Sequence, residues 1–173
     1  MLDPAGYCAV EALRDGTRIE IRALKPDDRG DLLAAVNRAS TQSLFRRFFA
    51  VRRHFTEKEI DFFTRVDFVT HVALVAAVEE NGRATIVGGG RYIVVKPGEA
   101  ELAFAVIDPY QGRGIGSMLL RHLIAIARAG GMRELIADVL PGNTAMLKAF
   151  ERGGFRRKAA VQPDVVQVGL ELG

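Results

Sequence analysis

A glycine-rich turn between two apolar segments is the stretch of this chain with the clearest chemical meaning. Gly112, Gly114 and Gly116 occupy alternate positions, after an apolar segment at residues 101–107 and before a helical pattern that starts at residue 118. Glycines leave backbone N–H groups uncovered, and the first N–H groups of a helix have no partner within that helix. Together with the positive end of the helix dipole, such groups bind phosphate. The spacing therefore predicts a strand, a phosphate-binding turn and a helix.

Two common phosphate-binding motifs do not fit this turn. A P-loop requires Lys-Ser or Lys-Thr after its last glycine, and this turn has neither. A dinucleotide-binding fingerprint requires glycine at the sixth position counted from Gly112, where this chain has Ser117, and an acidic residue at a strand end about 20 residues later, which is also missing. The remaining pattern is Gln-x-x-Gly-x-Gly, formed by Gln111, Gly114 and Gly116. It resembles the coenzyme A pyrophosphate loop of the GNAT N-acetyltransferase superfamily.

The resemblance extends over most of the chain, from about residue 17 to residue 172. It is also clear at residues 143–155, which look like the Asn-x-x-(helix)-Gly-Phe ending of the superfamily. It implies acetyl-CoA as cosubstrate, no metal, and a pantetheine arm lying along the strand at residues 104–106, with the Val106 N–H facing the thioester oxygen. The implied cofactor-binding residues are Phe104, Ala105, Val106, Gln111, Gly112, Arg113, Gly114, Ile115, Gly116, Ser117 and Asn143.

Acetyl transfer to an amine also needs a base, because a lysine with a pKa of about 10.4 is almost wholly protonated at neutral pH. Glu101, at the start of the apolar strand, matches the catalytic glutamate of the protein-lysine and histone branches of the superfamily. Desolvation there would raise the pKa of a carboxyl group toward the working range. Asp138 in the apolar segment 135–140 is the rival base, since other branches place a base on that strand. The structural alternatives are an exposed strand end for Glu101 and a hydrogen-bonded carboxylate for Asp138.

The chain departs from many members of the superfamily at Phe150, where a tyrosine often protonates the departing thiolate. Phenylalanine has no proton to donate. A thiol pKa of about 8.5 makes the thiolate a fair leaving group even without an acid. We therefore expect no general acid at this position.

Turn signals and hydrophobic periodicity predict the elements that position these residues. Asp15-Gly16 and Asn81-Gly82 each predict a β-hairpin, and Thr56 begins a capping box before a helix. Gly88-Gly89-Gly90 indicates a bulge or a close backbone approach inside a strand. Residues 1–6 are expected to be frayed. The expected helices span residues 26–38, 40–49, 57–66, 118–129 and 145–152. The expected strands span residues 7–13, 17–24, 72–78, 85–95, 101–107, 135–140, 155–161 and 165–172.

This order predicts one α+β domain over residues 1–173, with a mixed, mostly antiparallel central sheet flanked by helices. It also looks like the GNAT fold. Of the 173 residues, 49% are hydrophobic, enough for a sizeable core. A single cysteine, Cys8, excludes an internal disulfide and a cysteine-based metal cluster. No signal peptide is visible and no run approaches the ~18 apolar residues of a membrane span, so we expect a cytoplasmic protein.

The acceptor is the least constrained part of the prediction. A net charge of +3 is too small to indicate nucleic-acid binding. Residues 43–49 and 67–76 resemble bacterial protein lysine acetyltransferases, which implies a protein lysine as acceptor, for example on an acyl-CoA synthetase. Arginines at positions 46, 47, 52 and 53 could dock an acidic surface. The alternatives are acetylation of a small amine, and a catalytically silent module that binds acyl-CoA.

Overall fold

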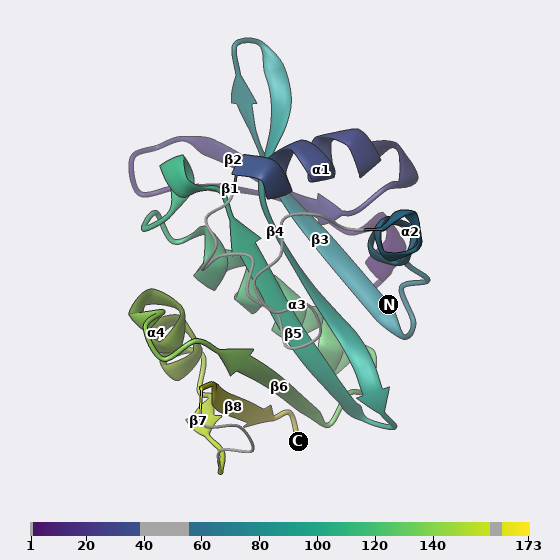
Figure 1. Ribbon diagram of the computed structural model, residues 1–173, viewed down its shortest axis with the longest axis vertical. Helices are drawn as coiled ribbons and strands as arrows, with labels where there is room; N and C mark the ends of the chain where they lie inside the picture. The colour runs from purple at the N-terminus through teal and green to yellow at the C-terminus, as the bar shows by residue number, and fades with distance from the viewer. Residues whose placement is uncertain (1, 39–55, 160–163) are drawn as a thin grey trace.

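The computed structural model describes residues 2–38, 56–159 and 164–173, which form a sheet with helices on both faces (Figure 1). The described strands are ordered β1-β2-β3-β4-β5-β6-β8-β7, and every neighbouring pair runs antiparallel except β5 and β6, which run parallel. Their bounds are β1 (Cys8–Ala12), β2 (Arg18–Ala23), β3 (His71–Glu80), β4 (Arg83–Lys96), β5 (Glu99–Val106), β6 (Glu134–Val139), β7 (Arg156–Arg157) and β8 (Val166–Glu171). The predicted α+β fold with a mixed, mostly antiparallel sheet is confirmed.

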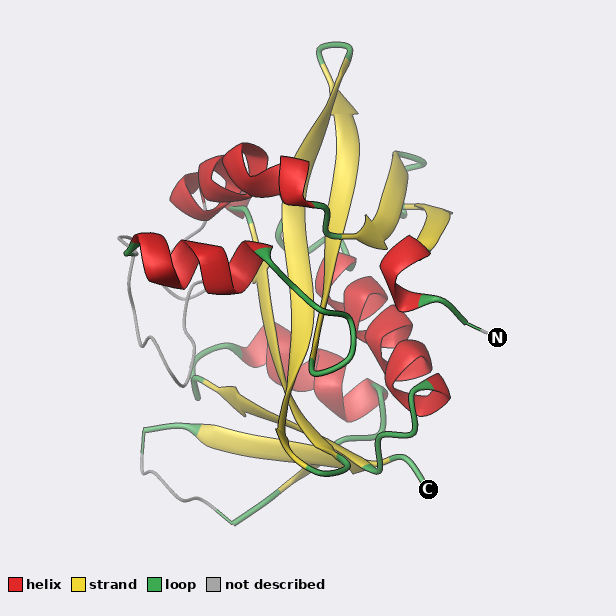
Figure 2. Cartoon of the chain, turned by 90° about the vertical axis from the view of Figure 1, so that its right-hand side faces the viewer, coloured by secondary structure: helices red, strands yellow, loops and turns green. Residues whose placement is uncertain are grey.

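Helices cover the sheet on both sides. Figure 2 shows α1 and α2 on one face and α3 on the opposite face, and α4 packs beside α3. The described helices are α1 (Arg29–Arg38), α2 (Glu57–Thr64), α3 (Ile115–Ala129) and α4 (Thr144–Arg152), with short 3-10 turns η1 (Pro4–Gly6), η2 (Pro26–Asp28) and η3 (Asp108–Tyr110). None of them combines the length and the apolar character that crossing a membrane requires.

The core lies between the sheet and α3. Ile115, Leu119, Leu123 and Ile126 are all buried, and their spacing of four, four and three residues places them along one face of the helix. In β3, every side chain from His71 to Val78 is buried, because both faces of this central strand are covered. The sheet and α3 therefore form a rigid base for the turn that joins β5 to α3.

The hairpin between β3 and β4 turns at Asn81-Gly82, as predicted. Both residues have positive φ, 52° for Asn81 and 78° for Gly82, which is the conformation that this dipeptide favours in two-residue hairpins. The predicted capping box of α2 is also present: the Thr56 hydroxyl accepts a hydrogen bond from the Glu59 N–H at 3.2 Å, and the Glu59 carboxylate accepts one from the Thr56 N–H at 3.0 Å.

The three glycines of β4 show both predicted features. The register between β3 and β4 shifts between Ala76 and Ala77, opposite this segment. A β-carbon on Gly90 would lie 2.7 Å from the Phe104 ring and 3.0 Å from Leu123. Glycine at position 90 therefore leaves room for the Phe104 ring of β5 and the Leu123 side chain of α3 to pack over β4.

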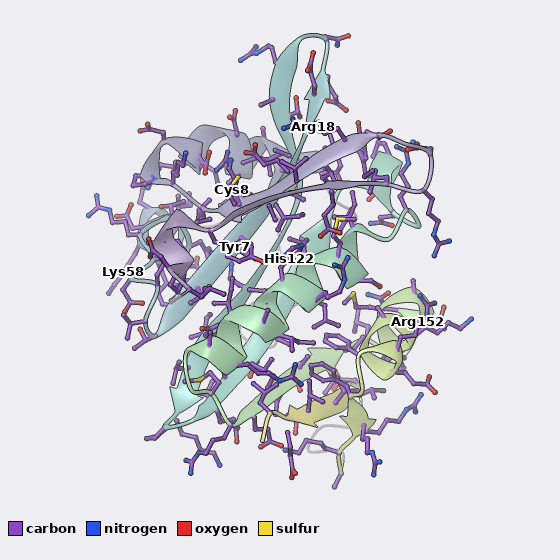
Figure 3. All side chains as sticks on the ribbon, turned by 180° about the vertical axis from the view of Figure 1, so that it is seen from behind. Tyr7, Cys8, Arg18, Lys58, His122 and Arg152 are labelled. Atoms are coloured by element: carbon purple, nitrogen blue, oxygen red, sulfur yellow. The ribbon has the colours of Figure 1, made fainter. Side chains whose placement is uncertain are left out.

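The N-terminal segment, in which a frayed end at residues 1–6 was expected, contains the short turn η1. Within the described residues, Asp3 accepts a hydrogen bond from the Ala5 N–H at 3.2 Å and caps η1, and Leu2 packs against the core. Figure 3 shows Tyr7 beside His122 of α3, and the Tyr7 hydroxyl is hydrogen-bonded to His122 Nδ1. Residues 4–6 thus form a capped turn, and Tyr7, which follows them, contacts a residue 115 positions away in the sequence.

Two further expectations concern segments near gaps in the described ranges. β7 covers Arg156–Arg157, which is shorter than the strand expected at residues 155–161. The helix expected at residues 40–49 and the arginines at positions 46, 47, 52 and 53 lie outside the described residues.

Candidate active site

The strands β5 and β6 part in the middle of the sheet. Their pairing covers residues 99–102 of β5 and residues 134–137 of β6. β5 continues to Val106 and β6 to Val139, but no pairing joins them there within the described part of the chain. Backbone groups of residues 103–106 that point toward β6 therefore have no strand partner on that side. Such an edge can pair with an extended ligand as an added strand would.

The direction of the Val106 backbone follows from its neighbours. The Ile107 N–H donates to the Val87 carbonyl on the β4 side at 2.9 Å. Because successive residues of a paired strand direct their polar groups to opposite sides, the Val106 N–H and C=O point away from β4, toward the gap. The Val106 carbonyl indeed accepts a hydrogen bond from Gln111 Nε2 at 3.0 Å, which ties the turn to the end of β5.

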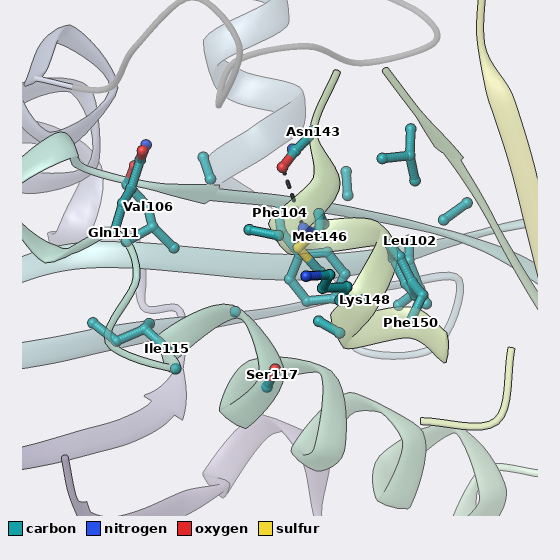
Figure 4. Close-up of a pocket in the computed structure, with 18 of the residues that line it drawn as sticks. Leu102, Phe104, Val106, Gln111, Ile115, Ser117, Asn143, Met146, Lys148 and Phe150 are labelled. Carbon is teal, nitrogen blue, oxygen red and sulfur yellow. Dashed lines mark hydrogen bonds between the residues drawn. The ribbon is translucent and has the colours of Figure 1, made fainter. Parts of the chain in front are cut away.

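A cleft of about 470 Å³ opens where the two strands part (Figure 4). It brings β5, the glycine turn, β6 and the start of α4 together. The residues named from the sequence that line it are Glu101, Phe104, Ala105, Val106, Gln111, Gly112, Gly114, Ile115, Gly116, Ser117, Asn143 and the rival base Asp138.

Arg113 is the member of the predicted set that does not line this cleft. Its guanidinium lies 4.8 Å from the centre of the Tyr110 ring and 3.7 Å from the Asp15 carboxylate in the turn between β1 and β2. Hydrogen bonds from Thr17, helped by the charge of Arg113, hold the pKa of Asp15 below its usual value. The side chain thus fastens the outer side of the glycine turn, and only the Arg113 backbone remains part of it.

The glycine turn has the geometry expected of an anion cradle. Gly112 and Gly114 have φ of 75° and 89°, and a β-carbon on either would meet no other atom within 4 Å. Gly114 is the N-cap of α3, so the N–H groups of Ile115, Gly116 and Ser117 belong to the first turn and have no acceptor within the helix. The open space and these donors fit a phosphate group at the positive end of the helix dipole.

Glu101 lies inside the sheet at the base of the cleft. It pairs with Ile93 of β4 and Ile136 of β6, and only 7% of its surface is exposed. The alternative of an exposed strand-end glutamate is therefore wrong. A carboxylate held between two apolar neighbours at the wall of a cleft is placed to exchange a proton with a ligand inside it.

Asp138 lines the same cleft from β6. Its Oδ1 accepts a hydrogen bond from Gln167 Nε2 of β8 at 3.1 Å. Because Ile136 pairs with Glu101 and side chains alternate along a strand, Asp138 lies on the same face of the sheet as Glu101, two residues further along β6. In the described ranges, no group of three His, Cys, Asp or Glu side chains is placed to hold a metal ion.

α4 closes the other wall of the cleft. Asn143 caps it, with Oδ1 accepting a hydrogen bond from the Met146 N–H at 3.2 Å. Phe150 is 2% exposed, and its ring stacks edge-on with Phe104 and Phe155, at centroid distances of 5.9 and 4.8 Å. Position 150 therefore contributes packing to the cleft and no proton donor.

Three cations at the cleft were not among the site residues predicted from the sequence. Lys148 and Arg152 come from α4, and Arg14 comes from the turn between β1 and β2. The first two carry a signal that sequence reasoning could have used, since residues four apart lie on one face of a helix. Arg14 carries no such local signal, because only tertiary packing brings the first hairpin to the glycine turn.

Comparison with known proteins agrees with this fold and site. A family-wide profile described as the Acetyltransferase (GNAT) family matches residues 32–155. The chain belongs to this family and is an acetyltransferase. The fold of the family uses acetyl-CoA, which matches the phosphate cradle and the unpaired edge of β5.

The chain is similar to several acetyltransferases over most of its length. An acetyltransferase from Pseudomonas aeruginosa is 34% identical over 79% of this chain and 74% of its own length. Acetyltransferase Pat from Mycolicibacterium smegmatis is 34% identical over 82% of this chain. The aligned part covers only 42% of Pat, which is a longer protein. Among solved structures, the GNAT domain of S. lividans PAT superposes with a TM-score of 0.84 and 35% identity, covering 95% of this chain and 96% of that domain.

Proposed function

We propose that this protein transfers the acetyl group of acetyl-CoA to a lysine side chain of a folded protein, with Glu101 as general base. The observation that carries the proposal is the position of Glu101. Its buried carboxylate lies at the wall of the cleft, one residue before β5 and β6 part. A base at this place would meet an amine that enters beside the unpaired edge of β5.

Three features of the chain would bind acetyl-CoA. The N–H groups of residues 115–117 and the open space at Gly112 and Gly114 would hold the pyrophosphate. The edge of β5 at residues 104–106 would hold the pantetheine arm. The bound cosubstrate supplies an activated acetyl thioester. The Val106 N–H, which points into the gap, would stabilise negative charge that develops on the thioester oxygen.

Glu101 would remove the main obstacle to reaction, which is the positive charge on the acceptor amine. Neutralising a lysine at pH 7 costs about 4–5 kcal/mol, since its pKa is about 3.4 units higher. Glu101 would accept the amine proton while the new N–C bond forms and the C–S bond breaks. Phe150 offers no proton to the departing sulfur, which leaves as a thiolate; its conjugate acid has a pKa of about 8.5.

The preference for a protein acceptor rests on similarity. Two proteins named Pat or PAT, a name that denotes protein acetyltransferase, cover most of this chain at 34% and 35% identity. An acyl-CoA synthetase is the acceptor class that this similarity suggests. A folded acceptor brings binding energy from surface far from the reacting amine, so a free lysine should be a poor substrate. The reaction consumes acetyl-CoA, a cytoplasmic metabolite, and we place the enzyme in the cytoplasm.

The experiment compares acceptors under one set of conditions. The purified protein is incubated with labelled acetyl-CoA and either an intact acyl-CoA synthetase, a lysine peptide from it, or a panel of polyamines, aminoglycosides and amino acids. The proposal predicts the highest kcat/KM for the intact protein. A small amine acetylated more efficiently than any protein would assign the enzyme to the small-molecule class, and binding of acetyl-CoA without any turnover would indicate a silent module.

A further inference from the structure

Two cations on α4 lie at the cleft and have no carboxylate partner. Lys148 and Arg152 both line the cleft and are exposed, and neither forms an ion pair with any described residue. Some exposed cations of the described chain do pair, as Arg121 does with Glu11 and Lys158 with Glu134, whereas unpaired ones such as Arg18 and Arg128 do not line the cleft. Two unpaired cations beside a ligand cleft indicate an anionic group on the ligand.

α4, which carries this pair, packs against α3, whose first turn forms the phosphate cradle. Met146 Sδ lies 3.4 Å from the place of a β-carbon on Gly116, in the first turn of α3. The helix is fixed by buried Phe150 and capped by Asn143 (Figure 4). Lys148 follows Met146 by two residues, and Arg152 lies one turn further along, at the outer edge of α4 (Figure 3).

Acetyl-CoA carries a further phosphate group besides the pyrophosphate that the cradle would hold. The first turn of α3 has the donors for the pyrophosphate. The remaining anion of acetyl-CoA is the 3′-phosphate of its ribose, a phosphomonoester whose second pKa of about 6 makes it largely dianionic at neutral pH. An ammonium and a guanidinium one helical turn apart match a dianion in charge, and the planar guanidinium adds a two-pronged hydrogen-bond donor.

We propose that Lys148 and Arg152 bind the 3′-phosphate of coenzyme A and make the enzyme discriminate against 3′-dephosphorylated acetyl-CoA. This inference rests on the proposed use of acetyl-CoA and adds the residues that select the complete nucleotide. Arg14 is the competing cation at the cleft. It is a single charge in a turn, beside the Asp15 carboxylate, whereas the α4 pair presents two charges from one rigid helix.

The test combines protein variants with a ligand variant. Calorimetric affinities are measured for acetyl-CoA and for acetyl-3′-dephospho-CoA with the wild type and with the Lys148→Gln, Arg152→Gln double variant. The affinity of the wild type for acetyl-CoA should be at least about tenfold higher than its affinity for the dephosphorylated compound. The double variant should lose that preference, through weaker binding of acetyl-CoA and unchanged binding of the dephosphorylated compound.

Matched controls separate this effect from a general loss of positive charge. The Arg18→Gln, Arg128→Gln double variant removes two exposed cations that do not line the cleft and should keep the full preference. Equal weakening of both ligands by the α4 variant, or loss of the preference in Arg14→Gln alone, would overturn the assignment. Equal wild-type affinity for both ligands would overturn it while leaving the proposed function intact. Failure of the wild type to bind either ligand would overturn both.

Discussion

Glu101 of β5 pairs with Ile136 of β6 one residue before the pairing of these two strands ends. All residues of β5 are described, and their two carboxylates are Glu99 and Glu101. Of these two, Glu101 lies nearer to the point where the sheet opens. The side chain is buried by the paired part of the sheet, and the unpaired part forms the cleft above it. The same divergence of strands thus creates both the binding edge and the setting of the proposed base.

The phosphate cradle can be tested at Ser117, in the first turn of α3 at the cleft. Ser117→Asp places a negative charge beside the predicted pyrophosphate, and we expect acetyl-CoA affinity to fall by about tenfold or more. An acidic residue near a helix N-terminus favours the helix, so the fold should survive. Ser117→Asn has nearly the same shape without the charge and should bind much more tightly than Ser117→Asp. Equal calorimetric affinities of the two variants would contradict the cradle.

Two glycines with different surroundings should respond in opposite ways to substitution by alanine. Gly90→Ala should destabilise the protein by about 1–3 kcal/mol, because its β-carbon would meet the Phe104 ring, which is itself packed against Phe150. Gly30→Ala in α1, where a β-carbon has open space and φ is not positive, should stabilise by about 0.4–1 kcal/mol. Urea denaturation measures both, and a Gly90→Ala variant as stable as the wild type would show that the interior relaxes freely there.

The turn before β3 predicts an acid-sensitive contribution to stability. Asp67 accepts hydrogen bonds from the N–H groups of Val69, Thr70 and His71 and from the Thr70 hydroxyl. The Thr70 hydroxyl bond is the leading cause that lowers the pKa of Asp67 to about 2, from an ordinary value of 3.8. Because the folded-state pKa is the lower one, the contribution is complete above about pH 5 and is lost as the pH falls toward 2.

Asp67→Asn tests this contribution. The variant should be less stable than the wild type at pH 6, and the difference should shrink between about pH 4 and pH 2 as the wild-type carboxylate becomes protonated. Circular dichroism during urea denaturation at each pH measures it, with Asp164→Asn as an exposed control. A difference that stays constant down to pH 2 would show that the carboxylate charge is not involved.

The sequence predicted those parts of the fold that short-range chemistry determines. The Asn81-Gly82 turn, the Thr56 capping box and the helix that follows the glycine turn each depend on a few adjacent residues. This helix, α3, begins at Ile115, three residues before the predicted start. The glycine pattern also predicted a turn after the strand, and Gly112 and Gly114 have the positive φ that glycine readily adopts.

Features that depend on distant residues could not be predicted in this way. The parting of β5 and β6 results from pairing between segments more than 30 residues apart. The contact between Arg113 and Asp15, which turns the arginine side chain away from the cleft, joins residues 98 positions apart (113 − 15 = 98). The same first hairpin brings Arg14 to the cleft, and Tyr7 forms a hydrogen bond with His122, a residue 115 positions away.

The most direct measurement of the central claim is the turnover of Glu101→Gln beside that of Asp138→Asn, with an intact acyl-CoA synthetase as acceptor. Both substitutions nearly keep the size of the side chain and remove its negative charge and its ability to take up a proton. The account predicts that Glu101→Gln lowers kcat by about 100-fold or more, with acetyl-CoA affinity nearly unchanged, and that Asp138→Asn has a much smaller effect. Loss of turnover in Asp138→Asn together with wild-type turnover in Glu101→Gln would contradict the assignment of Glu101 as the base.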